Sequence, residues 1–295
     1  MRRVWRGRLR PTKGGTAFRH AAGAVALAGV VLVAAAGVAH AATKGYDVSW
    51  PQCGRALPVD GDFRIVGVTG GKPYDTNPCL AEQYRWAVAA PGVAFYMNTA
   101  NPGPASQIIN WYAQKTPNAA CSRSNEAACA YNYGYNAAQQ AFVYAQRQTS
   151  GAATHGWWLD VETTNSWSGD VAQNVADILG SIAYLRAQGV PVGVYSTDYQ
   201  WGKITGGAHI PELFNWLAGA RDAAQAERWC APDSTFTGGP VVMVQWVEND
   251  LDHDHACAPL PTVVPVAGPG SPLERLLNDV LTLNVTQLLK DLQGG

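Results

Sequence analysis

The sequence predicts an α/β protein folded as a single (β/α)8 barrel of the TIM type. Short β-type runs alternate with stretches of helical periodicity about eight times between residues 45 and 258. Such alternation implies parallel strands joined by crossovers, and a barrel of this kind typically needs about 250 residues. An open doubly wound sheet is the alternative, but no Gly-x-Gly-x-x-Gly run follows the first strand.

The elements follow one another in a regular order. Strands are expected over residues 46–50, 63–69, 93–99, 157–161, 191–196, 214–217 and 241–247, the last two being the final strands. Helices are expected over residues 80–89, 107–114, 137–148, 171–188 and 222–228. The barrel domain is therefore assigned to residues 45–258.

Residues 1–41 are expected to be a signal peptide that is not part of the fold. Seven basic residues precede an apolar stretch over 21–38, and Ala39-His40-Ala41 is a small-x-small cleavage site. An uncleaved membrane anchor is the alternative, because the apolar stretch is long for a signal peptide. We predict a secreted or cell-wall-associated protein, exported by the Sec or the twin-arginine route.

The charge of the chain without this leader argues against several partners. It has 14 basic and 22 acidic side chains, a formal net charge of −8. An acidic surface argues against nucleic acid as a partner and against electrostatic docking on anionic lipid. Asp250, Asp252 and Asp254 have calcium-loop spacing, but His255 and Pro261 stand where that loop requires Gly and Glu. No metal and no cofactor are therefore predicted.

All six cysteines lie beyond the leader, and an even number in an exported chain indicates disulfide bonds. Six cysteines allow 15 pairings. The sequential set is preferred: Cys53–Cys79, Cys121–Cys129 and Cys230–Cys257. A metal cluster is the alternative, although the chain has no Cys-x-x-Cys pair.

The composition changes after Cys257. Residues 259–271 form a Pro/Gly/Val linker, and Ser271 and Glu274 form a capping box around Pro272. An amphipathic helix is expected over 272–293. This helix either packs back on the barrel or is a candidate for self-association.

Two carboxylates at the end of one predicted strand are the most informative residues. Asp160 and Glu162 follow the apolar run that contains Trp157 and Trp158. Side chains alternate along a strand, so both acids point to the same face with Cα atoms about 7 Å apart. Such a pair can divide acid and base work, as glycoside hydrolysis requires. The alternative is a strand end that pairs with a basic side chain or caps the next helix.

Other acids are expected to meet this pair, because barrel active sites collect at the carboxyl ends of strands. Asp47 lies on the first strand and Asp252 follows the last one. Closing the barrel joins these strands, so both acids are expected at one seam. Aromatic side chains near the strand ends are candidate sugar-stacking surfaces, and the substrate-binding candidates beside Asp252 are Trp50, Trp158, Tyr195 and Trp246.

Three spaced motifs resemble the glycoside hydrolase family 25 (GH25) lysozymes. They are Gly-x-Asp-Val-Ser-x-x-Gln from Gly45, Leu-Asp-Val-Glu from Leu159, and Gln245-Trp246 followed by an Asp-x-Asp run. The chain is also similar to exported proteins described as glycoside-hydrolase-like, or domain-of-unknown-function 1906 (DUF1906) type. The resemblance covers roughly residues 45–257.

The resemblance implies a β/α barrel that cleaves the β-1,4 bond of peptidoglycan between N-acetylmuramic acid and N-acetylglucosamine. Glu162 would be the general acid, and Asp160 would support the developing positive charge or position an N-acetyl group. Asp47 and Asp252 would line the sugar subsite.

The chain departs from the family after the second strand. The lysozymes usually carry a Lys-Ala-x-Glu-Gly type run there, whereas this chain has Val68-Thr69-Gly70-Gly71-Lys72, without an acid. A non-catalytic carbohydrate or cell-wall binding protein on the same barrel is therefore the alternative to an enzyme. An interaction scaffold that works through the C-terminal helix is the third hypothesis.

Overall fold

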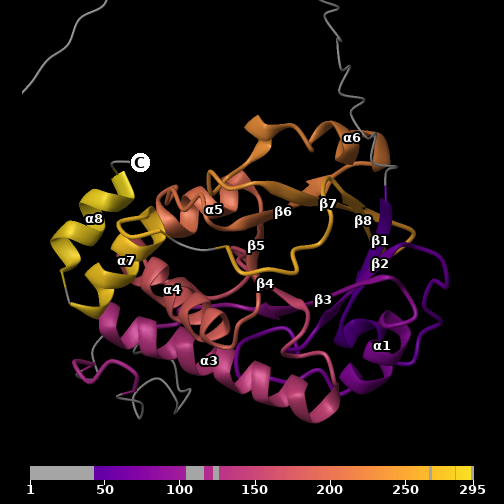
Figure 1. Cartoon of the computed structure of the whole chain (residues 1–295), viewed down its shortest axis with the longest axis horizontal. Helices are drawn as coiled ribbons and strands as arrows, with labels where there is room; N and C mark the ends of the chain where they lie inside the picture. The colour runs from indigo at the N-terminus through magenta and orange to yellow at the C-terminus, as the bar shows by residue number, and fades with distance from the viewer. Residues whose placement is uncertain (1–42, 104–115, 122–125, 266–267, 283, 294–295) are drawn as a thin grey trace, which may run out of the picture. The chain divides into compact units, whose positions relative to one another are not determined.

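A computed structural model shows eight strands closed into a barrel in the order β1 to β8 (Figure 1). The structure describes residues 43–103, 116–121, 126–265, 268–282 and 284–293. The strands are β1 Thr43–Val48, β2 Phe63–Gly67, β3 Gly92–Asn98, β4 Gly156–Asp160, β5 Val192–Ser196, β6 Phe214–Ala220, β7 Val241–Glu248 and β8 Leu251–Ala256. The predicted fold class is confirmed.

Helices connect the strands along the outside of the barrel, as crossovers between parallel strands require (Figure 1). The α-helices are α1 Leu80–Ala87, α3 Ala127–Gln148, α4 Val171–Ala187, α5 Asp198–Thr205, α6 Ala223–Arg228, α7 Pro272–Leu281 and α8 Val285–Gln293. Two short 3₁₀ helices, Trp50–Gln52 and Pro232–Ser234, lie in the connections.

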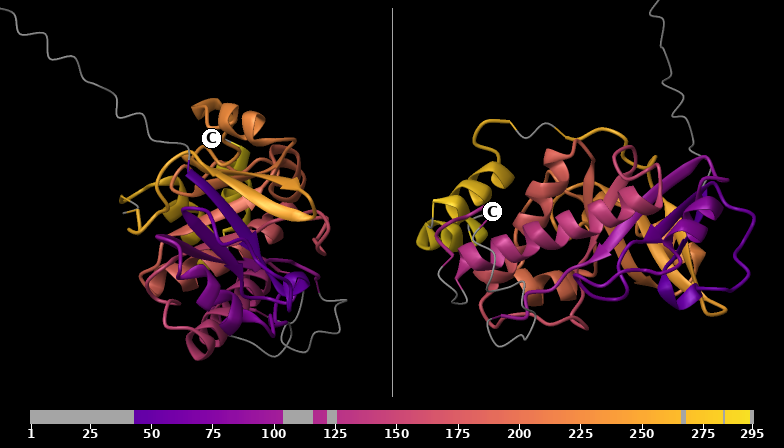
Figure 2. Two further views of the ribbon diagram at one scale, coloured as in Figure 1. Left: turned by 90° about the vertical axis from the view of Figure 1, so that its right-hand side faces the viewer. Right: turned by 90° about the horizontal axis from the view of Figure 1, so that it is seen from below.

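The last strand differs from expectation and closes the barrel in the opposite direction. Asn249 and Asp250 have φ of 54° and 59°, and they form a two-residue turn between the paired residues Glu248 and Leu251. Two positive φ values in succession are typical of a type I′ hairpin. The acidic run is therefore strand β8, antiparallel to both β7 and β1, and not a loop after the last strand (Figure 2).

Side chains fill the lower interior of the barrel and its outer surface in separate clusters. The inner cluster contains Phe63, Ile65, Trp158, Trp216 and Met243, all nearly inaccessible to solvent. The outer cluster lies between the strands and the helices. The filled interior leaves the carboxyl ends of the parallel strands as the place where polar side chains collect.

Helices α3 and α4 are in backbone contact at two glycines. A Cβ added at Gly134 would lie 1.9 Å from the carbonyl oxygen of Asp177, and one at Gly180 would lie 2.1 Å from that of Tyr131. Helix α3 begins ten residues before the expected start at residue 137. Its first half is rich in Tyr, Asn and Gly, which are weak helix formers, and packing against α4 compensates for this.

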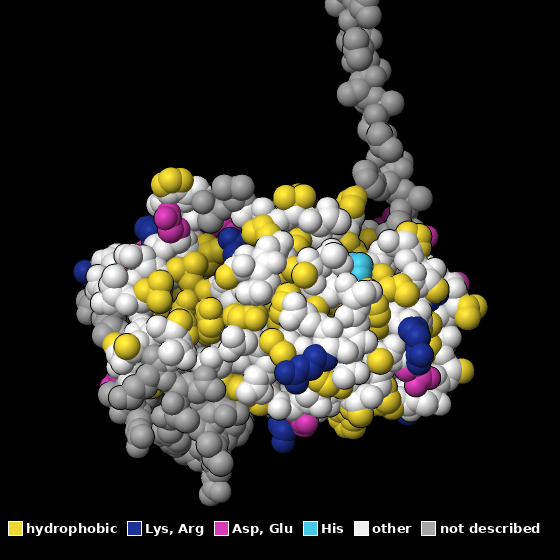
Figure 3. Space-filling model, turned by 60° about the horizontal axis from the view of Figure 1, so that its bottom comes forward, with side chains coloured by type: hydrophobic (Ala, Val, Ile, Leu, Met, Phe, Trp, Pro, Cys, Tyr) yellow, Lys and Arg dark blue, Asp and Glu magenta, His cyan; other side chains and the backbone are white. Residues whose placement is uncertain are grey.

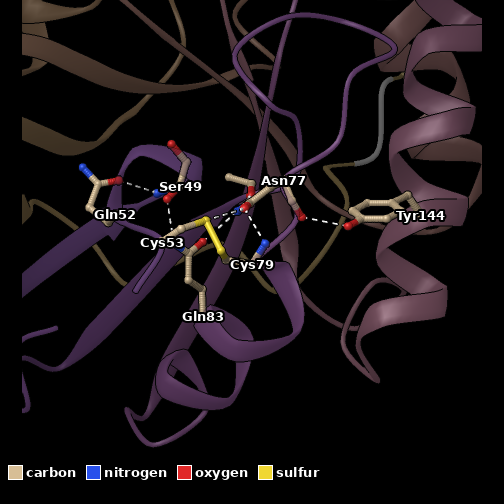
Figure 4. The surroundings of a disulfide bond; sticks show 8 residues. Ser49, Gln52, Cys53, Asn77, Cys79, Gln83 and Tyr144 are labelled. Carbon is tan, nitrogen blue, oxygen red and sulfur yellow. Dashed lines mark hydrogen bonds between the residues drawn. A yellow bond between two sulfur atoms is a disulfide. The ribbon is translucent and has the colours of Figure 1, made fainter. Parts of the chain in front are cut away.

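All three predicted disulfides are present: Cys53–Cys79, Cys121–Cys129 and Cys230–Cys257. The first of them joins the ends of β1 and β2 through the segments that follow these strands (Figure 4). Asn77 supports the same region, since its Nδ2 donates to the Gly67 carbonyl and to Gln83 Oε1, both at 2.7 Å. The loop between β2 and α1 is thus fixed at its far end.

The segment after the linker forms two helices, α7 and α8, where one was expected. Only one half of the predicted capping box is present: Ser271 Oγ accepts from Glu274 N, whereas the Glu274 side chain accepts from Gly270 N and not from Ser271 N. Leu273, Leu276 and Leu288 are buried in the outer core, so the apolar face packs back on the barrel domain. Self-association through this segment stays a prediction.

Two expectations lie outside the described residues, namely the signal peptide over 1–41 and the helix over 107–114. Within the described part of the chain, none of the helices combines the length and the apolar character needed to cross a membrane.

Replacing Gly180 by Ala tests the contact between α3 and α4. The added methyl group meets backbone that cannot move aside, so we expect the free energy of unfolding to fall by about 2–3 kcal/mol, the upper part of the usual range for overpacking. Gly202→Ala in α5 is the matched control. Its Cβ meets nothing within 4 Å, and we expect a gain of about 0.5–1 kcal/mol. Chemical denaturation measures both, and equal effects would contradict this account of the contact.

Candidate active site

Acids from three parts of the barrel meet at one end. Asp47 lies near the end of β1, Asp160 ends β4, and Asp252 lies near the start of the antiparallel β8. In the strand register Asp47 stands opposite Asp252, which confirms the predicted seam. Asn98 stands opposite Asp160. Side chains of these residues and of Glu162 therefore surround the open end of the barrel.

Asp160 is buried and has a neutral hydrogen-bond donor beside it. Asn98 Nδ2 donates to Asp160 Oδ2. Asn98 is held in turn by Thr69, whose hydroxyl donates to Asn98 Oδ1 at 2.7 Å and accepts from Asn98 N at 2.9 Å. The carboxylate of Asp160 is thus oriented through two neighbouring strands.

Asp160 and Glu162 interact directly, as their predicted common face requires. Burial, the charge of Glu162 and a hydrogen bond with that side chain raise the pKa of Asp160 well above its usual range, and only the amide of Asn98 opposes this. The raised pKa favours the neutral form of Asp160 beside the carboxyl group of Glu162.

Glu162 lies directly after β4 and is half-buried, whereas Asp160 is only 6% exposed. Gln200 Nε2 donates to Glu162 Oε1 at 3.4 Å. The amide of Gln200 is oriented by Thr163, whose N and Oγ1 donate to Gln200 Oε1 at 2.7 and 2.9 Å. Gln200 is in the first turn of α5, which Thr197 caps by accepting from Gln200 N. Helix α5 thereby fixes the position of Glu162.

The seam between β1 and β8 holds a second group of acids. Asp47 Oδ2 accepts from Gln245 Nε2 at 2.8 Å, and Gln245 Oε1 accepts from the Tyr195 hydroxyl at 2.7 Å. One layer deeper, Trp216 Nε1 donates to Asp254 Oδ1 at 2.8 Å. Each of these buried carboxylates therefore has a neutral donor from another strand.

Burial dominates the electrostatics of this seam. It raises the pKa of Asp47 well above the usual range, and the charges of Asp254 and Asp252 add to the effect. Burial also raises the pKa of Asp254 and of Asp252. For Asp252 the charge of Glu162 adds to burial, so the two acids interact across the opening.

The predicted aromatic candidates fall into two groups. Tyr195 faces the barrel interior through its bond to Gln245, and Trp50 is 48% exposed just after β1. Trp158 is 1% exposed and lies one layer below Asp160. Trp246 follows the inward-facing Gln245, so it points outward and stacks on His253. The positions of Trp158 and Trp246 do not support the predicted sugar contacts.

Sequence reasoning missed several neutral residues that support the acids. Asn98, Gln245 and Gln200 each donate to a carboxylate, and the half-buried Tyr96 side chain lies near Asp47, Asp160 and Asp252. Strand alternation was the available signal for Tyr96 and Gln245. Tyr96 is two positions from Asn98 on β3, and Gln245 precedes the outward-facing Trp246 on β7, so both side chains point into the barrel.

Among the described residues no cluster of three or more His, Cys, Asp or Glu side chains has an arrangement that could hold a metal ion. The opening instead combines carboxyl groups of raised pKa with neutral hydrogen-bond donors, an arrangement suited to proton transfer.

Sequence comparison relates the chain to lysozymes over part of its length. A family model described as lysozyme-like protein 1 matches residues 107–226. The protein named Probable GH family 25 lysozyme 4, from Dictyostelium discoideum, is 42% identical over 64 residues, which are 20% of this chain. Those residues span 30% of that relative. The predicted resemblance to GH25 proteins is confirmed, and the likeness to DUF1906-type proteins stays a prediction.

Solved structures similar to this one include two fungal proteins. A family GH25 lysozyme from Aspergillus fumigatus is 16% identical with a TM-score of 0.48, and the match covers 73% of this chain and 94% of that one. The muramidase from Trichobolus zukalii is 16% identical with a TM-score of 0.47, covering 72% and 92% of the two chains.

Replacing Asp254 by Asn tests the cost of the buried seam. Because folding raises the pKa of Asp254, the folded protein binds this proton more tightly, and stability is lost as pH rises above the usual carboxyl value of 3.8. Asn keeps the acceptor for Trp216 and does not ionise. We expect the melting temperature of the variant, relative to the unaltered protein, to increase between pH 4 and pH 8. Asp233→Asn, at an exposed position, is the control, and a difference independent of pH would contradict the assignment.

Proposed function

We propose that this chain, which is similar to GH25 lysozymes over part of its sequence, is an exported glycoside hydrolase acting on a cell-wall polysaccharide. Peptidoglycan is the proposed substrate, cleaved as by a muramidase. The observation that carries the proposal is the Asp160–Glu162 pair at the open end of the barrel. Glycoside hydrolysis needs a carboxyl group that protonates the leaving oxygen and a second one that supports the developing positive charge.

Glu162 is the proposed general acid. It is the member of the pair nearer to solvent, and Gln200 fixes its orientation. The proton transferred to the substrate is a carboxyl proton of the Asp160–Glu162 pair. Its delivery to the glycosidic oxygen accompanies cleavage of the bond from that oxygen to the anomeric carbon, and leaves a negative charge on the pair. Addition of water then returns one proton to the site.

Asp160, Asp47 and Asp252 are the proposed supporting acids. After proton transfer, Asp160 is positioned by Asn98 to stabilise positive charge on the sugar or to orient its N-acetyl group. Asp47 and Asp252, which stand opposite each other on β1 and β8, are proposed to bind the sugar from the other side of the opening. Trp50 and Tyr195 are the proposed aromatic contacts.

Export is supported by the three disulfides, since such bonds persist in oxidising compartments. It places the protein outside the cell or at the cell wall, where a polysaccharide substrate is accessible.

Replacing Glu162 by Gln tests the general acid. We expect release of soluble muropeptides from purified peptidoglycan to fall by about 10²–10⁴-fold, the usual contribution of general acid catalysis. Mass spectrometry of the products measures the release. Glu227→Gln, an exposed acid on α6, is the matched control and should retain full activity. Equal activity of the unaltered protein and Glu162→Gln would overturn the role of Glu162.

A non-catalytic cell-wall binding protein is the second candidate. The observation that favours it is Thr69, which lies two residues after the end of β2 and supports Asn98 where the lysozymes usually have an acid nearby. Pull-down of intact peptidoglycan without release of fragments, by the unaltered protein and by Glu162→Gln alike, would establish this function instead.

Replacing Gln200 by Ala tests the positioning of Glu162. Loss of the oriented amide leaves Glu162 free to rotate, so we expect kcat to fall about 10- to 100-fold with little change in KM. Gln225→Ala is the matched control. Gln225 also lies in the first turn of a helix, α6, and its side chain also accepts from the backbone N–H of the preceding loop, at Arg221, but away from the acids. A change in KM alone would assign Gln200 to substrate binding.

A further inference from the structure

We propose that the cleft between α3 and the loop joining β2 to α1 binds a short peptide that carries both a carboxylate and an amine, attached as a branch to the glycan. The cleft has a volume of about 400 Å³. One wall comes from the loop and the other from the second half of α3, and its lining includes Thr69, Tyr74, Asp75, Gln140, Tyr144 and Arg147. The proposal rests on the glycan-cleaving function proposed above.

The inner end of the cleft adjoins the acid pair. Thr69 lines the cleft and is almost fully buried, and its hydroxyl donates to Asn98, the residue that donates to Asp160. Thr69 therefore lies between the cleft and Asn98, the residue that orients the candidate catalytic carboxylate of Asp160. A substituent that leaves the glycan near the bond to be cleaved could extend into the cleft.

The two aromatic side chains of the cleft are held in place before any ligand binds. The hydroxyl of Tyr74 donates to the Tyr133 carbonyl at 2.8 Å, and that of Tyr144 donates to the Asn77 carbonyl at 2.7 Å (Figure 4). The Cys53–Cys79 disulfide fixes the end of the same loop. A preformed surface loses little conformational entropy when a ligand binds.

Tyr74 adopts a backbone conformation that a bulky residue rarely has. Its φ is 66°, in the left-handed region, which is a strained conformation for tyrosine. Tyr74 lies in the loop that forms one wall of the cleft. Strained residues concentrate at binding sites, where the surrounding structure maintains them for a purpose other than stability.

The charges of the cleft select the ligand. Arg147 and Asp75 are both exposed, and among the described residues neither makes an ion pair. Asp75 Oδ1 accepts from Thr76 N, so its other oxygen remains for a ligand. A guanidinium group binds a carboxylate through two hydrogen bonds, and a carboxylate binds an ammonium group. A peptide with a free carboxylate and a diamino acid supplies both, whereas a glycan strand without its peptides supplies no ammonium group.

The face that carries α3 has few charged side chains. This side of the molecule comes forward in Figure 3, and most of its described surface there is uncharged, with separate basic and acidic side chains. The amide side chain of Gln140, also in the lining, can bind peptide groups as donor and acceptor.

The test compares two substrates that differ only in the branch. Glycan strands bearing their peptides are compared with the same strands after an amidase has removed them. We expect the unaltered protein to prefer the peptide-bearing strands, and Arg147→Gln to lower kcat/KM on them about tenfold without changing kcat/KM on the bare strands. Asp75→Asn is expected to act in the same direction. Arg228→Gln, at an exposed position on α6, is the control. An equal effect on both substrates, or none, would overturn the proposal.

A second measurement does not depend on catalysis. A tetrapeptide that contains one diamino acid, released from peptidoglycan by an amidase, is titrated into the protein and followed by NMR. We expect saturable binding with a Kd in the millimolar range for the unaltered protein, and weakening of about tenfold for Arg147→Gln. Binding of this peptide without cleavage of either glycan would refute the proposed function and leave the peptide site standing. Cleavage without peptide binding would refute the peptide site alone.

Discussion

Burial of carboxyl groups at the open end of the barrel is the constraint on which the rest of the structure depends. An ionised carboxylate without partners in such a place costs several kcal/mol. Three of the acids each accept a hydrogen bond from a neutral donor on another strand: Asp160 from Asn98, Asp47 from Gln245 and Asp254 from Trp216. Burial also raises the pKa of all three acids, which favours their neutral forms. The upper lining of the barrel is therefore amide and aromatic rather than aliphatic.

The same support continues outward from the acids to the helices. Thr69 orients Asn98, and the loop that begins beside it is joined at Asn77 to the hydroxyl of Tyr144 on α3. Helix α3 is in turn held against α4 by the backbone contact at Gly180. A continuous series of contacts thus runs from the acid pair to the helix pair, so small changes in helix packing would reach the geometry of the acids.

The sequence predicted those features that follow from strand count and alternation. About eight alternating units imply a closed barrel, although only seven strands were located, and closure implies that Asp47 and Asp252 meet. The partners of the acids were not predictable, because they depend on register between strands that are distant in sequence, as with Asn98 and Asp160. Trp246 was selected for its aromatic ring although its neighbour Gln245 has the inward position. The Asn249-Asp250 turn could have indicated that the chain reverses direction into an antiparallel β8. The residues that follow it are polar and acidic, however, and such a run resembles a loop.

The seam between β1 and β8 also determines when the site can exist during folding. The bond from Gln245 to Asp47 joins residues 198 positions apart in the chain. Contacts of such long sequence separation form late, because the entropy of closing the intervening loop must be lost before they stabilise the fold. A nascent chain that lacks β8 therefore has no assembled acid cluster. Any hydrolytic capacity of this protein would arise only after its last strand has been synthesised and has paired with the first.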